Sequence, residues 1–111
     1  SQLLLISGAA ETSMGLSQFN KLKASTPISH DRELNASLQR IGNRIAAVAP
    51  LPNADWEFVL FDDPEQANAF CLPGGKVGVY TGILKYARDD TGLATIIGHE
   101  GLFVLFQAKI V

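Results

Sequence analysis

Apolar residues recur every three or four positions in two stretches of the first half of the chain, and this spacing predicts two helices. The first stretch spans residues 2–23 and contains two glycines, each of which disfavours a helix by about 1 kcal/mol relative to Ala. The second stretch follows Pro27, can be capped by Ser29 or Asp31, and ends before the prolines at positions 50 and 52. The apolar face of the first stretch consists of Leu5, Ala9, Thr12, Leu16, Phe19 and Leu22. The face of the second consists of Leu34, Leu38, Ile41, Ile45 and Val48.

Aromatic and β-branched residues in the middle of the chain predict strands in place of helices. Residues 56–61 (WEFVLF) read as one strand, and residues 68–80 read as a hairpin whose turn is PGG at 73–75. A short helical turn is expected over 83–86. These elements predict an α+β fold, with helices on a small, mostly antiparallel sheet.

A further helix is predicted over residues 91–100, because Asp90 or Thr91 can cap it and apolar residues follow at helical spacing. His99 and Phe103 would lie one turn apart on one side of it. Beyond Gly101 the apolar run 102–106 fits a continued buried helix or a strand, and periodicity does not choose between them.

Composition narrows the class of protein. The 111 residues are enough for one domain, and with 47% hydrophobic and 18% charged residues the chain is globular rather than disordered. A net charge of −2 gives no electrostatic reason to expect nucleic acid or an anionic membrane as partner. The single cysteine, Cys71, excludes an intrachain disulfide and is expected to be buried. The acids Asp62, Asp63 and Glu65 lack the spacing of a calcium loop and are expected to form a solvated turn.

Three short motifs carry a family resemblance when they are taken together. They are NAF at 68–70 with PGG at 73–75, VYTGIL at 79–84, and LATIIGHE at 93–100. In this order and spacing, the chain from Thr26 to Glu100 resembles the zinc metallopeptidases that include the HtpX-like proteases, the CAAX prenyl proteases and bacterial periplasmic lipoprotein relatives. The resemblance implies that residues 1–111 form a single, partial, gluzincin-like metallopeptidase domain.

The same resemblance implies a set of roles. His99 would be the first ligand of a zinc cofactor, and Glu100 the general base that takes a proton from metal-bound water. Asn68, Ala69 and Phe70 would form the edge strand that pairs with an extended peptide or an unfolded protein substrate. Family members of this branch imply a periplasmic or outer-membrane-associated location in bacteria.

Two departures from the family pattern predict that the chain as written is inactive. Phe103 stands where the second zinc-binding histidine is expected, and the third ligand, a Glu on a later helix, would fall beyond Val111. Three origins remain open: a truncated or frame-shifted coding sequence, an appended protease-cleavage tag, and a diverged pseudo-peptidase. Two functional alternatives also remain. One is a non-catalytic domain that binds peptides, or a second copy of itself, through the 68–71 edge. The other is a fragment that associates through exposed apolar surface.

Overall fold

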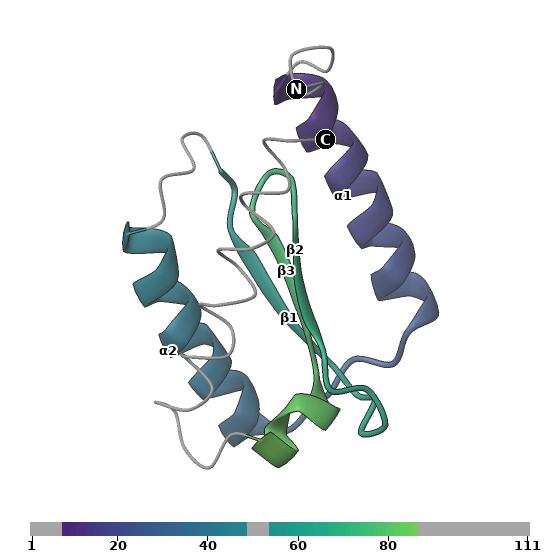
Figure 1. Ribbon diagram of the computed structural model, residues 1–111, viewed down its shortest axis with the longest axis vertical. Helices are drawn as coiled ribbons and strands as arrows, with labels where there is room; N and C mark the ends of the chain where they lie inside the picture. The colour runs from purple at the N-terminus through teal and green to yellow at the C-terminus, as the bar shows by residue number, and fades with distance from the viewer. Residues whose placement is uncertain (1–7, 49–53, 87–111) are drawn as a thin grey trace.

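The computed structural model describes residues 8–48 and 54–86, and within them two α-helices cover opposite faces of a small sheet (Figure 1). This arrangement confirms the predicted α+β class. The helices are α1 (Gly8–Ser25) and α2 (Arg32–Val48), and the strands are β1 (Glu57–Phe61), β2 (Ala69–Leu72) and β3 (Lys76–Tyr80). A 3₁₀ helix, η2 (Thr81–Tyr86), follows β3 where the helical turn was expected. In this described part of the chain, neither α-helix is long and apolar enough to cross a membrane.

The sheet has the strand order β1-β3-β2, so the last strand in sequence is the central one. β3 is antiparallel to β2, as the hairpin predicted, and parallel to β1. The sheet is therefore mixed, whereas the sequence pattern suggested mostly antiparallel pairing. All five residues of β3 are buried, as expected for a strand with a neighbour on each side and a helix over each face.

The parallel pairing depends on how the chain leaves β1. The loop 62–68 crosses the end of β3 and starts β2 on the far side, and the hairpin then brings β3 back into the centre. Asp63 holds this crossing, because its N–H donates to Thr81 Oγ1 (2.9 Å) and its carbonyl accepts from the N–H of Gly82 (3.0 Å). The two segments lie so close that a Cβ on Gly82 would overlap the carbonyl oxygen of Gln66.

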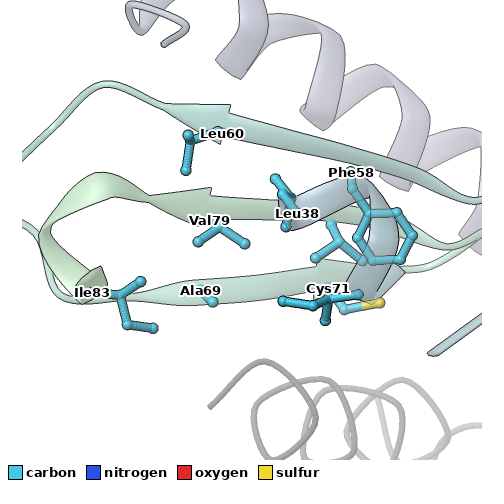
Figure 2. Packing of buried hydrophobic residues seen from close by; sticks show 9 residues of the cluster. Leu38, Phe58, Leu60, Ala69, Cys71, Val79 and Ile83 are labelled. Atoms are coloured by element: carbon cyan, nitrogen blue, oxygen red, sulfur yellow. The ribbon is translucent and has the colours of Figure 1, made fainter. Parts of the chain in front are cut away.

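The face under α2 is the main apolar core (Figure 2). Asp31 caps the helix as predicted, with Oδ1 accepting the N–H of Leu34 at 2.9 Å. Val48, the final residue of α2, is 81% exposed, so the buried face is shorter than the apolar stripe in the sequence. Burial at a helix end depends on what lies opposite, which spacing does not record. The buried members of this core are Leu38, Ile41, Phe58, Leu60, Ala69, Cys71, Val77, Val79 and Ile83.

The face under α1 has a smaller, aromatic core built from Phe19, Phe61 and Tyr80. The ring of Phe19 meets the edge of Phe61 at a centroid distance of 6.3 Å. Gly15, which counted against a helix in the sequence, is the point of closest approach: a Cβ there would overlap the carbonyl oxygen of Pro73 in the β2–β3 turn. The glycine therefore allows α1 to lie against the hairpin.

Candidate functional site

The predicted site residues fall into two groups in the structure. His99, Glu100 and Phe103 lie outside the described residues, so their roles as ligand, base and missing ligand stay predictions from the sequence. Asn68, Ala69 and Phe70 are described. Asn68 directly precedes β2, and the other two are its first residues.

β2 is an outer strand of the sheet, as is β1, and within residues 8–48 and 54–86 the strand partner of β2 is β3. The N–H of Tyr80 donates to the carbonyl of Asn68 at 3.0 Å, so that carbonyl points toward β3. In a trans peptide the carbonyl of one residue and the N–H of the next point in opposite directions. The N–H of Ala69 therefore points away from the sheet. By the alternation of an antiparallel pair, the backbone of Cys71 does the same.

The outward N–H of Ala69 is already bonded. The side-chain oxygen of Asn68, Oδ1, accepts it at 2.9 Å, while the Asn68 residue as a whole is exposed. Sequence reasoning assigned Asn68 to the peptide-binding edge but did not foresee this contact, because no residue pattern distinguishes it from an Asn facing solvent.

The side chains of β2 anchor the strand on both faces of the sheet. Ala69 and Cys71 join the core under α2 and are 3% and 2% exposed. Phe70 points to the other face, where its ring lies 6.4 Å from that of Phe19 and 6.0 Å from that of Tyr80. The outer strand is thus fixed by its side chains, and because Ala69 and Cys71 are nearly buried as whole residues, their outward backbone groups are covered as well.

Burial also determines the chemistry of Cys71. Loss of hydration raises the pKa of its thiol from 9.0 to about 11. The thiol donates a weak hydrogen bond to the Leu72 carbonyl, at an S–O distance of 3.6 Å. A neutral thiol with this environment is a poor nucleophile, so Cys71 acts as a core residue.

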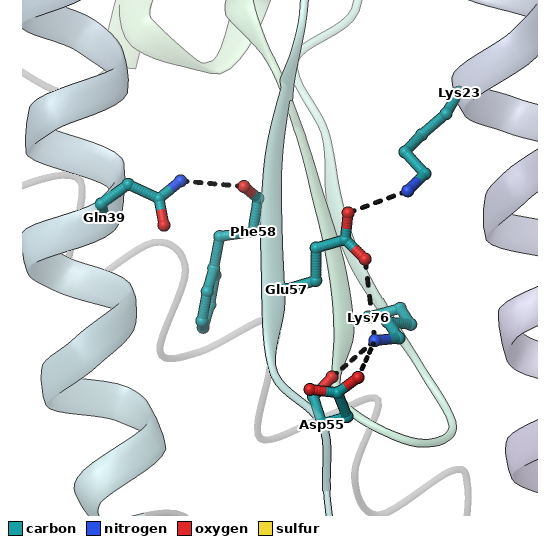
Figure 3. A network of polar contacts seen from close by, with 6 residues as sticks. All are labelled: Lys23, Gln39, Asp55, Glu57, Phe58 and Lys76. Carbon is teal, nitrogen blue, oxygen red and sulfur yellow. Dashed lines mark hydrogen bonds and ion pairs between the residues drawn. The ribbon is translucent and has the colours of Figure 1, made fainter.

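A polar network connects the strands to α1 (Figure 3). Lys76, whose side chain is 6% exposed, donates to the carbonyl of Asp55 at 2.7 Å and lies 3.3 Å from its carboxylate and 3.6 Å from that of Glu57. Lys23 of α1 reaches the other carboxylate oxygen of Glu57 at 2.8 Å. The buried ammonium is therefore fully paired, and the network positions α1 rather than offering a free reactive group. The sequence pattern did not indicate that Lys76 is buried.

No group of three or more His, Cys, Asp or Glu side chains that could hold a metal ion occurs among the described residues. Asp63, one of the acids considered for calcium, uses its carboxylate oxygens within its own turn. They accept the N–H of Glu65 (3.2 Å) and the side-chain amide of Gln66 (3.1 Å). This geometry orders the loop that leads into Asn68.

Comparison with known proteins shows which family and which relatives this chain resembles. Residues 32–101, from the first residue of α2 to Gly101, match Peptidase family M48. The chain is 39% identical over 70 residues to the mitochondrial metalloendopeptidase OMA1 of Arabidopsis thaliana, covering 63% of this chain and 14% of that protein. It is 43% identical over 63 residues to OMA1 of Schizosaccharomyces pombe, covering 57% of this chain and 18% of the relative. It is 30% identical over 90 residues to the beta-barrel assembly-enhancing protease of Yersinia pestis, covering 81% of this chain and 18% of that protein.

The matched range contains β1, the β2–β3 hairpin and the His99-Glu100 pair, whereas α1 lies outside it. The chain spans 14–18% of the length of these relatives. The expected resemblance is confirmed at the level of the family: this chain belongs to Peptidase family M48.

Proposed function

We propose that this chain carries the substrate-binding edge of a family M48 endopeptidase and binds extended peptide along the outer side of β2 without cleaving it. The observation that supports the proposal is the position of β2, an outer strand with backbone groups of Ala69 and Cys71 directed away from the sheet. Ala69 and Cys71 are nearly buried, so a peptide would have to displace what covers them; it would then form main-chain hydrogen bonds and need little side-chain selectivity. Unfolded or extended protein segments are the substrate class that this edge fits.

The proposed lack of cleavage rests on the donors available to zinc, the cofactor that the family implies. A catalytic zinc site uses three protein ligands and one water. His99 supplies one imidazole, but Phe103, one turn later, has no lone pair to donate. These residues do not fit a catalytic zinc, so Glu100 would lack the acidified water on which a general base acts.

The first experiment maps peptide binding. A labelled decapeptide of alternating Thr and Val, flanked by lysines, is titrated into the ¹⁵N-labelled chain. The largest amide shifts are expected at Ala69 and Cys71, with smaller changes in β1, and the peptide mass should stay unchanged after incubation. Shifts confined to other segments, or none at all, would refute the β2 edge as the binding surface.

The second experiment measures zinc. We expect well below one zinc per purified chain, because Phe103 has no lone pair to donate to the metal. Near-stoichiometric zinc, together with casein cleavage that disappears in a Glu100→Gln variant, would show that the chain is an active peptidase.

Self-association through the same edge is the second candidate function. Two antiparallel copies of β2 related by a two-fold axis at Phe70 would set Ala69 of one copy opposite Cys71 of the other, and these are the residues whose backbone points outward. Light scattering between micromolar and millimolar concentration tests this arrangement. A monomer throughout that range would exclude it.

The cellular location is also a proposal. Relatives from Yersinia pestis and Escherichia coli are named beta-barrel assembly-enhancing proteases, and bacterial β-barrels of this kind belong to the outer membrane. These names support a periplasmic or outer-membrane-associated location as the proposal for this chain. The OMA1 relatives are named mitochondrial, so fractionation of the source cell decides between these compartments.

A further inference from the structure

We propose that α2 and the linker before it close the outer edge of β1, and that this edge closure keeps a second copy of the chain from pairing there as an added strand. The edge closure has two parts. The first is the linker segment 27–29, and the second is the pair of amide side chains of Asn35 and Gln39, one helical turn apart on α2. The edge closure does not depend on peptide binding at β2.

The direction of the β1 backbone shows which groups need a partner. The N–H of Glu57 donates to the carbonyl of Gly75, just before β3, at 3.0 Å. Because successive residues of a strand direct their backbone groups to alternate sides, Phe58 and Leu60 direct theirs away from β3. A row of such groups without partners is a template for pairing with another chain.

The linker pairs with one end of this edge. The N–H of Ser29 donates to the Leu60 carbonyl at 2.9 Å, and the N–H of Asp62 donates to the Pro27 carbonyl at 2.8 Å. These two bonds flank an antiparallel bridge at the centre of the segment 27–29. A very short strand of this kind is one of the ways in which proteins blunt a sheet edge.

The two α2 amides complete the edge closure. Gln39 Nε2 donates to the Phe58 carbonyl at 2.9 Å (Figure 3). Asn35 Nδ2 donates to the Ser29 carbonyl at 3.0 Å and so ties the linker to the helix. Gln39 therefore binds the outward carbonyl that precedes the one bound by the linker. Phe58 and Leu60 are 8% and 2% exposed as whole residues, as a covered edge requires.

The sequence of β1 is the reason that an uncovered edge would matter. Residues 56–61 (WEFVLF) combine high β propensity with one charge and no Pro or Gly, which is the composition of segments that pair between chains. An antiparallel second copy centred on Val59 would set the outward groups of Phe58 opposite those of Leu60. It would also set Glu57 opposite Phe61, so the two carboxylates would not face each other. The partner that this edge fits is therefore β1 of a second copy.

Two variants open the edge closure on the full chain. Gln39→Leu removes the donor to Phe58, and Gln39→Leu combined with Asn35→Ala also frees the linker from α2. Each neutral hydrogen bond changes an association constant by about two- to tenfold, so the double variant should associate at a concentration about four- to hundredfold lower than the wild type. Sedimentation equilibrium measures this concentration. A double variant that associates no more readily than the wild type, with native Trp56 fluorescence, would overturn the edge closure.

The single variant and two matched controls separate an opened edge from added apolar surface. Because Gln39 is exposed, Gln39→Leu should keep the core and associate about two- to tenfold more readily than the wild type. Gln18→Leu makes the same change at an exposed position of α1 and should behave as the wild type does. Gln39→Lys restores a donor and adds a charge that protects edge strands, so it should also match the wild type. Association of either control as strong as that of Gln39→Leu would overturn the edge closure.

Amide hydrogen exchange locates the contact. Between dilute and concentrated double variant, new protection should fall on the amides of Phe58 and Leu60. Protection gained at Ala69 and Cys71 in their place would assign the association to β2 and overturn the edge closure. In dilute samples, the Ser29 amide should exchange faster in the double variant than in the wild type. Equal exchange would show that α2 does not hold the linker, and would likewise refute the proposal.

Discussion

The two faces of the sheet are held by different physical means. Under α2 lies a core of aliphatic and aromatic side chains, and Leu38 and Ile41 of the helix are completely or almost completely buried. Under α1 the helix contributes one fully buried large side chain, Phe19. Its further attachments are the close approach of Gly15 to Pro73 and the ion pair of Lys23.

This difference indicates that the face under α2 contributes most of the stability, whereas α1 can detach from its face. An apolar core loses stability with every atom removed from it. A helix held by one ring, one close approach and an ion pair that is about one third exposed can separate while the sheet persists. The part of the chain that matches the family begins with α2, so the dry face belongs entirely to the matched range. We therefore expect α2 and the sheet to form the cooperative unit, with α1 as an addition to it.

Truncating the core under α2 should have the largest effect. Leu38→Ala removes a fully buried side chain and should lower the free energy of unfolding by about 2–5 kcal/mol. Urea unfolding followed by the fluorescence of Trp56, the only tryptophan, measures it, since the indole stacks on Phe58 in this core. A loss below about 1 kcal/mol would contradict a tightly packed face.

Raising the pH tests whether water reaches the core under α2. The pKa of Cys71 is raised to about 11 in the fold from 9.0 in the unfolded chain, so the unfolded chain loses its thiol proton first as pH rises. The associated stability is complete below pH 9 and falls away between about pH 9 and pH 11, by about 2–3 kcal/mol in total. Lysines and tyrosines titrate in the same range. The difference in free energy of unfolding between wild type and Cys71→Ala, measured from pH 9 to pH 11, separates the contribution of the Cys71 thiol from theirs. A difference that does not change with pH would mean that water reaches the thiol.

Adding a side chain where Gly15 meets Pro73 should detach α1 from the sheet without unfolding the core under α2. Gly15→Ala places a methyl group against the backbone of Pro73, and strain of this kind costs about 1–3 kcal/mol, partly offset by the better helix propensity of Ala. Trypsin should then cut at Lys21 and Lys23 more rapidly, while the fluorescence of Trp56 stays unchanged. Ser17→Ala, on the exposed side of α1, is the matched control and should leave cleavage as it is. A parallel loss of the Trp56 signal would mean that both faces unfold together.

Removing the ion pair should have the smallest effect. Lys23→Gln breaks the bond to Glu57, but both side chains are about one third exposed, so solvent screening limits the loss to about 0–1 kcal/mol. The loss should shrink further between 0.1 M and 1 M salt. Lys21→Gln, at an exposed neighbouring position, provides the comparison. A Lys23→Gln effect that salt leaves unchanged would point to its packing over the Phe19 ring, where the ammonium lies 5.3 Å from the centroid.

Local signals account for the parts of the fold that could be predicted. The Asp31 cap, the 3.6-residue period of α2 and the PGG turn are properties of neighbouring residues, and the structure confirms each of them. Gly74 and Gly75 adopt φ values of +94° and +90°, which is the conformation that made glycine the expected residue there. Non-local features escaped prediction. The parallel pairing of β1 with β3 and the close approach at Gly15 depend on partners that the local pattern does not name.

The candidate site also has features that could be predicted from local sequence and features that could not. That Ala69 and Phe70 lie in a strand could be read from the sequence. The position of this strand at the outside of the sheet is visible only once β3 is known to be central. Lys76 gave no sign of being buried, because its acceptors come from Glu57 of β1 and from Asp55, just before that strand. The roles of His99 and Glu100 still rest on sequence, supported by a family match that extends through both.

The central position of β3 also has a consequence for synthesis on the ribosome. β1 leaves the exit tunnel first, yet its strand partner is made about twenty residues later, with the other edge of the sheet in between. At ordinary elongation rates this leaves an apolar strand waiting for about one to four seconds before it can pair with β3. A chaperone that shields nascent chains would find its binding site at Glu57–Phe61 during that interval.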